Sequence, residues 1–554
     1  MSRFGDALVA LCTLSQRIIG AFMQRRQLLT RLSQLAAALA WQQVFAPGVR
    51  AQGADPGNAG NWSEPGEVFT LGVASGEPRP DAVVLWTRLA PKPLSPDGGM
   101  PARAVPVLWE VAADQRFNQI VRYGAVVAEP LSAHCVHVDV DGLAPGRTYY
   151  YRFRAGGQLS PVGRTRTAPA ADERVERLRM AVASCQHYET GYYAVHREIA
   201  AADLDLVLFL GDYIYETEAP AFAKVRQHPH VFPDDEAHYS LSDYRLHHAS
   251  YKLDADLRAS HAAHPWLMVW DDHEVVNDYA GSTSLDLDDQ HAFLRVRTAA
   301  YQAYFEHLPV SPTRAPVGAS MRMNEHYQWG MLADIWTIDG RQFRDPHVCS
   351  GVHAPQGGRA LWRCAKAEQP DRTLMGVEQE YWLADGLASS ERAWKFIAQP
   401  TQIAPGGVRT PFGPVVYADG WDAYPAARER LMAAIAQPRV PDVVCLGGDV
   451  HRHVAANLRL NPLDPSSPIV ASELVTTSVS SRGLSEFLSG LVRKSNPDLL
   501  HVRGDERGYL LLDVSPQQVQ CEFRATPHPV HPDARLRTQA RYVVERGVPG
   551  PHKA

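Results

Sequence analysis

Four short apolar runs of this chain each end in side chains that can bind a metal ion. The runs are MAVAS before Cys185, LVLFLG before Asp212, LMVW before Asp271 and Asp272, and VVCLGG before Asp449 and His451. Short runs that alternate with helical stretches, as they do from residue 178 onward, are typical of α/β folds. Ligands in such folds collect at the carboxyl ends of strands, so we expect these four ends to converge on one site.

The segment VWDDHEVVNDYA, residues 269–280, places several acidic side chains directly after an apolar run. Buried carboxylates repel one another and lose their hydration, unless solvent or a cation relieves them. One Gly-Asp pair after a strand is most often a turn, whereas four such ends in one chain are a specific signal. The pattern therefore predicts a metal site.

The chain divides into an all-β part and an α/β part. Residues 66–168 contain alternating apolar runs separated by Gly/Pro turns, which predicts a β-sandwich whose last strands resemble a fibronectin-type domain. A polar link follows, and residues 176–530 are predicted to form the catalytic domain. The segment 508–525 is predicted to be its closing β-hairpin.

The N-terminal segment has the features of an export signal. Arg25 and Arg26 precede a moderately apolar, Ala-rich stretch, and a small-x-small pattern predicts cleavage after Ala51. This resembles a twin-arginine signal over residues 1–51, with Met23 as an alternative start; an amphipathic N-terminal helix is the other interpretation. Export would involve the Tat translocase and place the protein in the periplasm or outside the cell. No other segment is apolar enough for a membrane span.

Net charge and cysteine content reduce the number of possible functions further. The chain has a net charge of −6, and residues 1–51 hold six arginines and one aspartate, so the remainder is more acidic still. An acidic surface argues against a nucleic-acid-specific binding surface but not against metal cations. Cys349 and Cys364 lie in a polar stretch and are a candidate disulfide. The surroundings of Cys135, Cys445 and Cys521 indicate buried thiols.

Six motifs, in order, resemble those of the alkaline phosphatase D (PhoD) family of calcineurin-like metallophosphatases. They are ASCQ, LGDYIYE, WDDHEVVND, DGRQFRD, DGWDAYP and GGDVHRH. The resemblance implies a four-layer α/β/β/α metallophosphatase sandwich, preceded by an all-β fibronectin/Ig-like domain. It also implies Fe(3+) beside Ca(2+), and hydrolysis of phosphomonoesters and phosphodiesters.

The expected ligands follow from these motifs. Compared with the wider superfamily, a thiol at Cys185 stands where a carboxylate is usual, and Tyr215 adds a phenol; both are anionic donors that favour ferric iron. Carboxylates replace an amide at Asp272 and an imidazole at Asp449, which suits calcium. The full predicted set is Cys185, Asp212, Tyr215, Asp272, Asn277, Asp449 and His451.

His273, Arg341 and Arg482 are the predicted catalytic residues. His273 resembles the outer histidine that protonates the leaving group, and the two arginines, with Arg344, could hold phosphate oxygens. Structural alternatives stay open: an ion pair for each arginine, a buried apolar role for Cys185, packing for Tyr213. Asn277 and Asp278 are either ligands or a helix cap, and His453 is expected behind the ligands.

The sequence thus predicts an exported phosphoesterase in which metal ions polarise the phosphate and activate an attacking hydroxide or oxide. Its substrates would be small-molecule or polymeric phosphate esters. One alternative is a phospholipase D-like or wall-polymer phosphodiesterase. Another, of a different class, is a non-catalytic protein that binds metal and phosphate without turnover.

Overall fold

The computed structural model describes residues 66–554, apart from 350–351, 354–358, 363 and 439. All of these residues belong to one unit, Ala59–Ala554. The predicted signal segment 1–51 lies outside the described residues. Within the described part, no helix combines the length and apolarity needed to cross a membrane.

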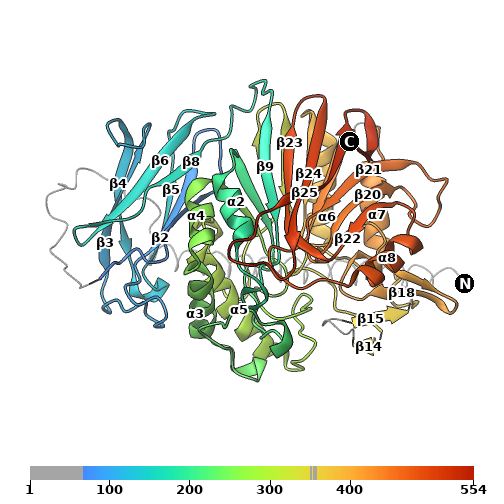
Figure 1. The fold of residues 1–554 in the computed structure, drawn as a ribbon, viewed down its shortest axis with the longest axis horizontal. Coiled ribbons are helices and arrows are strands. Elements are labelled where there is room, and N and C mark those ends of the chain that lie inside the picture. Colours follow the sequence, from blue (N-terminus) through green and yellow to red (C-terminus); the bar gives the residue numbers. More distant parts are fainter. Residues whose placement is uncertain (1–65, 350–351, 354–358, 363, 439) are drawn as a thin grey trace, which may run out of the picture. The chain divides into compact units, whose positions relative to one another are not determined.

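A ten-stranded sheet carries three of the four predicted strand ends (Figure 1). Its strands β9, β10, β11 and β1 run parallel, and the C-terminal hairpin extends it on one side. In spatial order its strands are β26 (Val548–Lys553), β25 (Arg537–Glu545), β24 (Gln518–Pro527), β23 (Glu506–Val514), β9 (Leu178–Ala183), β10 (Leu206–Leu210), β11 (Pro265–Val269), β1 (Val73–Gly76), β2 (Val83–Arg88) and β5 (Cys135–Val140).

A seven-stranded sheet carries the fourth end. Its order is β12 (Glu325–Trp329), β13 (Ala333–Thr337), β16 (Trp394–Ala398), β19 (Val443–Gly447), β21 (Ile469–Val475), β20 (His453–Arg459) and β22 (Leu499–Arg503). A small sheet beside it contains β14 (Val352–His353), β15 (Arg359–Trp362), β18 (Gly413–Tyr417) and β17 (Val408–Thr410).

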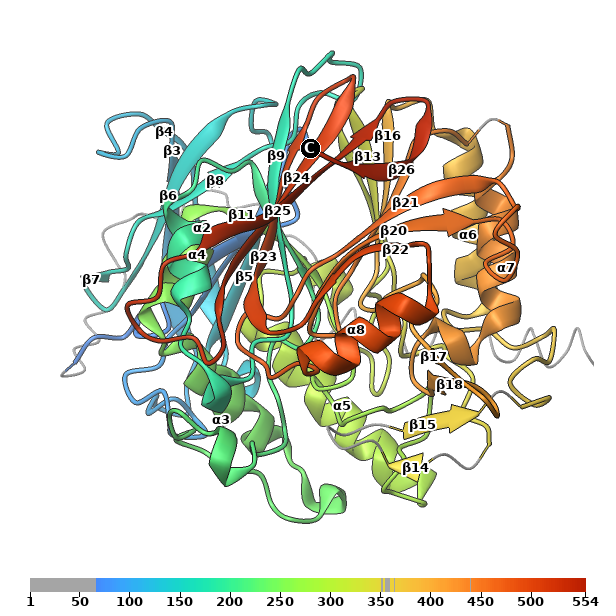
Figure 2. The same ribbon diagram turned by 45° about the vertical axis from the view of Figure 1, so that its right-hand side comes forward.

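Period-2 alternation lets each central strand serve two cores. In β9, Met180 and Val182 face a core shared with the seven-stranded sheet, while Ala181 and Ala183 face helices. The helices over the ten-stranded sheet are α2 (Ala194–Ala201), α3 (Leu241–Lys252), α4 (Ala255–Ala263) and α5 (Gln290–His307). The other sheet packs against α6 (Val377–Ser389), α7 (Pro425–Ile435) and α8 (Glu486–Ser495) (Figure 2).

Local sequence signals explain where several helices start. Ser240 and Asp243 form a capping box at α3, and Asp289 and Ser485 cap α5 and α8. Single 3₁₀ turns are η2 (Pro130–Ser132), η3 (Tyr188–Thr190), η4 (Ala221–Ala223), η5 (Glu236–His238), η6 (Pro312–Arg314) and η7 (Trp421–Ala423).

The predicted β-sandwich region, 66–168, is shared between two sheets. A separate sheet contains β4 (Ile120–Ala128), β3 (Val105–Ala112), β6 (Thr148–Ala155), β7 (Gln158–Leu159) and β8 (Gly163–Arg166). The strands opposite it, β1, β2 and β5, continue the ten-stranded sheet through the parallel pair β1–β11. The predicted boundary between the two domains is therefore crossed by one sheet.

Candidate metal centre

The four predicted strand ends meet in one place. Donor atoms of Cys185, Asp212 and His451 lie within 4.8 Å of one another, and the same holds for Asp212, Asp272 and His273. The first group joins loops from both large sheets, after β9, β10 and β19. Asp212 belongs to both groups, so it can bridge two ions.

Unusual backbone conformations aim these side chains. Cys185, Asp212, Asp449 and His451 have φ of 60°, 57°, 59° and 51°. Non-glycine residues adopt this left-handed region rarely, at a cost of about 1–3 kcal/mol each, and such residues cluster at functional sites. The loops also approach closely: a Cβ on Gly448 would lie 2.5 Å from Ser184 Oγ. The sequence uses glycine there because β9 and β19 converge.

Tyr215 completes the first group. Its hydroxyl donates to Asp212 Oδ2 at 2.8 Å and lies 3.1 Å from His451 Nε2. His451 Nδ1 donates to the Arg482 carbonyl at 2.7 Å, which directs Nε2 toward the group. Ser481 Oγ lies 2.8 Å from the Tyr215 hydroxyl. Thiol, phenol, imidazole and carboxylate thus face one point.

Among the described residues, no arginine or lysine forms an ion pair with this first group, and the positive charge that acts on Asp212 is that of His273. Burial raises the pKa of Cys185 well above its usual value, and the Asp212 carboxylate raises it further. Burial also raises the pKa of Asp212. Asp212 Oδ1 is buried and has no hydrogen-bond partner among the described residues. An unpaired buried oxygen beside a thiol, a phenol and an imidazole nitrogen fits a metal ion, which would add positive charge to the group.

His273 is held by a carboxylate behind it. His273 Nδ1 lies 2.7 Å from Glu216 Oε2, and Glu216 Oε1 accepts the Asn277 backbone N–H at 2.7 Å. Burial alone lowers the pKa of His273, but the charges of Glu216, Asp272 and Asp212 raise it well above its usual value. With Nδ1 engaged, Nε2 is the nitrogen available to the pocket.

A third acidic group is neutralised by arginine. Asp272, Asp278 and Asp419 have oxygens within 4.8 Å of one another. Arg341, which is 0% exposed, pairs with Asp271, Asp272 and Asp419. Arg344 Nη1 pairs with Asp419 Oδ1 at 2.6 Å. These two guanidinium groups hold the pKa of Asp419 well below its usual range, although burial opposes them.

A pocket of about 320 Å³ opens onto the first two groups. One wall holds polar side chains, namely Asp212, Asp272, His273, Asn277, Asp449 and His451. The apolar lining comes from β17, β18, α8 and the residue Leu484 before α8; it contains Val408, Val415, Val416, Leu484, Leu488 and Val492. Arg482 is exposed at this pocket, with its guanidinium carbon 4.9 Å from the Phe222 ring centroid.

Comparison with known proteins agrees with this geometry. Residues 180–523 match the model of the PhoD-like phosphatase family, and residues 55–169 match that of its N-terminal domain. The chain is 42% identical to alkaline phosphatase D of Bacillus subtilis (strain 168) over 492 residues, covering 88% of this chain and 82% of that protein. The chain belongs to the PhoD-like phosphatase family. It is therefore a phosphoric ester hydrolase.

The solved structures show the same relationship. A structure described as "Structure of PhoD" superposes with a TM-score of 0.83 at 41% identity, covering 89% of this chain and 93% of that one. The mixed α/β architecture with several sheets is thus common to both. A non-catalytic binding protein is excluded as the primary function.

In this PhoD-like phosphatase, most predicted ligands lie together. Asp449 lines the pocket, and its Oδ2 accepts from Thr401 Oγ1 at 2.6 Å; burial, with Asp419 and Asp272, raises its pKa to about 6. Asn277 also lines the pocket. The helix-cap alternative for Asn277 and Asp278 is wrong, because the next α-helix starts at Gln290 and is capped by Asp289.

The prediction that Arg341 is a catalytic residue is wrong. Its side chain is enclosed by three aspartates and does not line the pocket. The ion-pair alternative applies to it, and equally to Arg344. Of the three arginines, Arg482 alone reaches the pocket.

The remaining predicted positions do not line the metal pocket. The structure joins Cys349 and Cys364 in a disulfide. Tyr213 is buried, with its hydroxyl 2.9 Å from His261 Nε2, so it packs rather than ligates. His453 stacks on Phe523 with ring centroids 4.8 Å apart.

Two acids that the sequence reasoning did not single out organise the site. Glu274 accepts backbone N–H bonds from Asp212, Tyr213 and Asp271, and so ties the loops after β10 and β11 together. Glu216 orients His273. Both lie inside motifs already quoted, YIYE and DDHE, so their position in those motifs was the available signal.

Proposed function

We propose that the protein is an exported, metal-dependent phosphoesterase whose metals are held by Cys185, Asp212, Tyr215, Asp272, Asn277, Asp449 and His451. The observation that carries this proposal is the unpartnered Asp212 Oδ1, buried beside Cys185 and His451 at the wall of a pocket. The donor chemistry supports ferric iron near Cys185 and Tyr215, and calcium near Asp272 and Asp449.

When bound, such a metal pair polarises phosphate oxygens and activates a water for attack on phosphorus. The chain's own contribution is positioning and proton transfer. His273, oriented through Nδ1 by Glu216, presents Nε2 to the leaving-group oxygen and donates a proton there. Arg482 at the pocket binds a phosphate oxygen not held by the metals.

A phosphodiesterase of the phospholipase D type is the second candidate function. The apolar wall formed by Val408, Val415, Leu484, Leu488 and Val492 supports it. A phosphate group alone needs no such surface, whereas a diester with an apolar second arm would bury that arm there. Hydrolysis of cell-wall polymers, the other diester alternative, would not need this apolar pocket lining.

The packing of the sheets and helices supports the description of the fold as an α/β/β/α sandwich. One core lies between the two large sheets, and one lies under the helices on each outer side, as in an α/β/β/α sandwich. The sheet packed on β1, β2 and β5 is consistent with an Ig-like domain. Export by the twin-arginine route rests on Arg25 and Arg26.

Metal analysis of protein purified without chelator tests the proposal, alongside turnover of a phosphomonoester and a phosphodiester. We expect iron and calcium, and activity that disappears on chelation. Active protein free of both metals would reject it. For export, replacing Arg25 and Arg26 by lysine should retain precursor in the cytoplasm, because the receptor reads the arginine pair; unchanged export would reject that part alone.

A further inference from the structure

Helix α8 lies between two hollows of the surface. Leu488 and Val492 line the metal pocket. Arg493 and Lys494, on its last turn, line a separate open groove of about 980 Å³. In Figure 2, α8 lies across the front of the molecule beside β22. Other residues of this groove, from the start of β22 and from β25 and β26, are Pro497, Leu499, Leu500, His501, Tyr542, Pro551, His552 and Lys553.

The groove is basic on a protein of net negative charge. Five of its lining residues are basic, and among the described residues that line it there is no carboxylate. Arg493, Lys494 and Lys553 are exposed and form no ion pair with any described residue. His552 Nε2 lies 3.7 Å from Glu545 Oε1.

The cations of the groove also influence one another. Burial is the main cause that lowers the pKa of His501, and the charges of Arg493, Arg503 and Lys553 lower it further. His501 Nε2 donates to Gln539 Oε1 at 2.8 Å. The charges of Arg493 on α8 and Lys553 on β26 therefore act on the same region of the surface, where His501 lies.

Helix capping does not explain this arrangement. Arg493 and Lys494 suit the negative end of the α8 dipole. Lys553 and His552 lie on β26, and His501 lies on β22, where no helix end requires them. The lining also includes Tyr542 and Pro551, which are buried.

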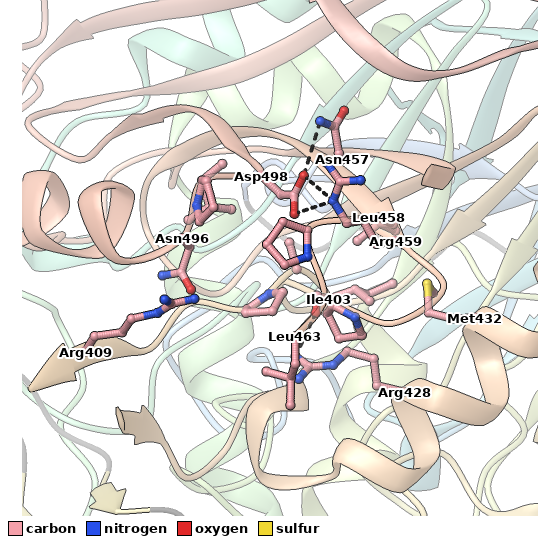
Figure 3. A pocket seen from close by; sticks show the side chains of 16 residues that line it. Ile403, Arg409, Arg428, Met432, Asn457, Leu458, Arg459, Leu463, Asn496 and Asp498 are labelled. Carbon is pink, nitrogen blue, oxygen red and sulfur yellow. Dashed lines mark hydrogen bonds and ion pairs between the residues drawn. The ribbon is translucent and has the colours of Figure 1, made fainter. Parts of the chain in front are cut away.

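A second cavity, drawn in Figure 3, provides a comparison for the cations of the groove. Arg459 is paired with Asp498 through Nε at 2.9 and 2.8 Å, and Arg428 pairs with Asp422 at 2.6 Å. That cavity measures about 30 Å³, which is space for water only. Arg428 and Arg459 are neutralised by these acids, whereas Arg493 of the groove forms no ion pair with a described residue.

We propose that the groove is a second, non-catalytic site for a linear polyanion that carries phosphate groups. It holds the unreacted part of a polymeric substrate whose scissile phosphate lies in the metal pocket. The ten residues of α8 span about 15 Å, so a chain of a few phosphate units reaches from one site to the other. This role rests on the proposed phosphoesterase function.

The test replaces the free cations and measures binding and turnover separately. The variant is Arg493→Glu, Lys494→Glu, Lys553→Glu. The control carries the same charge change on exposed cations of the N-terminal region: Arg103→Glu, Arg116→Glu, Arg174→Glu. Binding of inorganic polyphosphate to each metal-loaded protein is followed by fluorescence anisotropy at several salt concentrations.

We expect the groove variant to bind polyphosphate at least about tenfold more weakly, with a salt slope reduced by roughly three charges. The control should keep most of the affinity. Turnover of the small diester bis(p-nitrophenyl) phosphate should be equal in all three proteins, which also verifies folding. Lys553→Gln alone, at an exposed strand position, should weaken binding in the same direction.

Equal weakening in groove variant and control would show nonspecific attraction and overturn the proposal, as would absence of binding in the wild type. If the groove variant loses small-diester turnover, the single variant Lys553→Gln is used in its place. Unchanged polyphosphate affinity of Lys553→Gln would then reject the site. Loss of activity toward every ester, with polyphosphate binding retained, would instead reject the phosphoesterase function.

Discussion

Two groups of buried acids lie side by side in this protein, and among the described residues arginine pairs with Asp419 in one but not with Asp212 in the other. Around Asp419, Arg341 and Arg344 supply two guanidinium groups. In the part of the chain that the structure describes, no arginine or lysine pairs with the Asp212 carboxylate, and its Oδ1 has no partner. Because buried charge needs compensation, the difference indicates which group needs an ion from solution.

The largest expected effect is at the uncompensated group. Asp212→Asn keeps the shape but removes the charge that two ions would share. Turnover should fall by at least about 10³-fold, since metal ions contribute several kcal/mol of transition-state stabilisation. Metal content and kcat/KM check this. Retention of both metals and near-normal activity would remove the distinction between the two groups.

The second prediction concerns the softer donors of the same group. Cys185→Ser and Tyr215→Phe each remove an anionic ligand, so turnover should drop by about 10²-fold or more. A thiolate or phenolate on ferric iron gives a visible absorption band, which each change should shift or bleach. Calcium chelation should abolish activity while leaving most of that band. An unchanged spectrum in both variants would place the iron elsewhere.

The compensated group should respond in stability. Arg341→Met leaves buried Asp271 and Asp419 without their main partner, which should cost about 3–5 kcal/mol of unfolding free energy. Arg341→Lys is the matched control and should lose less. Urea denaturation measures both. A stable Arg341→Met protein with a selective loss of phosphate binding would return Arg341 to the catalytic set.

These predictions show where sequence reasoning succeeds and fails. Cys185, Asp212, Asp272 and His451 were predictable because each directly follows an apolar strand, and strand ends converge. The role of Arg341 was not, because its partners Asp271 and Asp419 lie 70 and 78 residues away in the chain. Local patterns reveal which side chains leave a strand, but not which distant charge they meet.

The same contrast between local patterns and distant partners applies to the fold. The short runs from residue 178 onward and the hairpin at 508–525 correspond to strands, since alternation is a local property. The parallel pairing of β1 with β11 joins Gly76 to Trp266. No local signal specifies a partner that distant, so the sequence could not predict that one sheet spans both regions.

A smaller effect is expected for Glu216, which contacts His273. Glu216→Gln keeps a hydrogen bond to His273 but removes the charge that raises its pKa. Turnover should fall by about 10–100-fold for esters with poor leaving groups, and less for good ones that need no proton. Rates across a leaving-group series check this. An equal loss for all leaving groups would indicate a general structural role.

The smallest effect concerns Lys252, a buried amine whose pKa burial lowers to about 7 from its ordinary value of 10.5. Between these values the unfolded chain binds a proton that the folded protein does not, so stability rises with pH in that window. The contribution is about 1.4 kcal/mol per pH unit, and Lys252→Met should remove it. Urea midpoints at pH 7.5 and 8.5 measure the difference; identical pH slopes in both proteins would contradict the assignment.

The position of the iron tests the central claim most directly. Anomalous X-ray diffraction near the iron edge, on crystals of protein purified without chelator, locates that metal without reference to activity. We predict a peak within bonding distance of Cys185 Sγ, Asp212, the Tyr215 hydroxyl and His451 Nε2, and none between Asp278 and Asp419. Absence of iron from the first group, or an iron peak held by Asp419, would contradict the account.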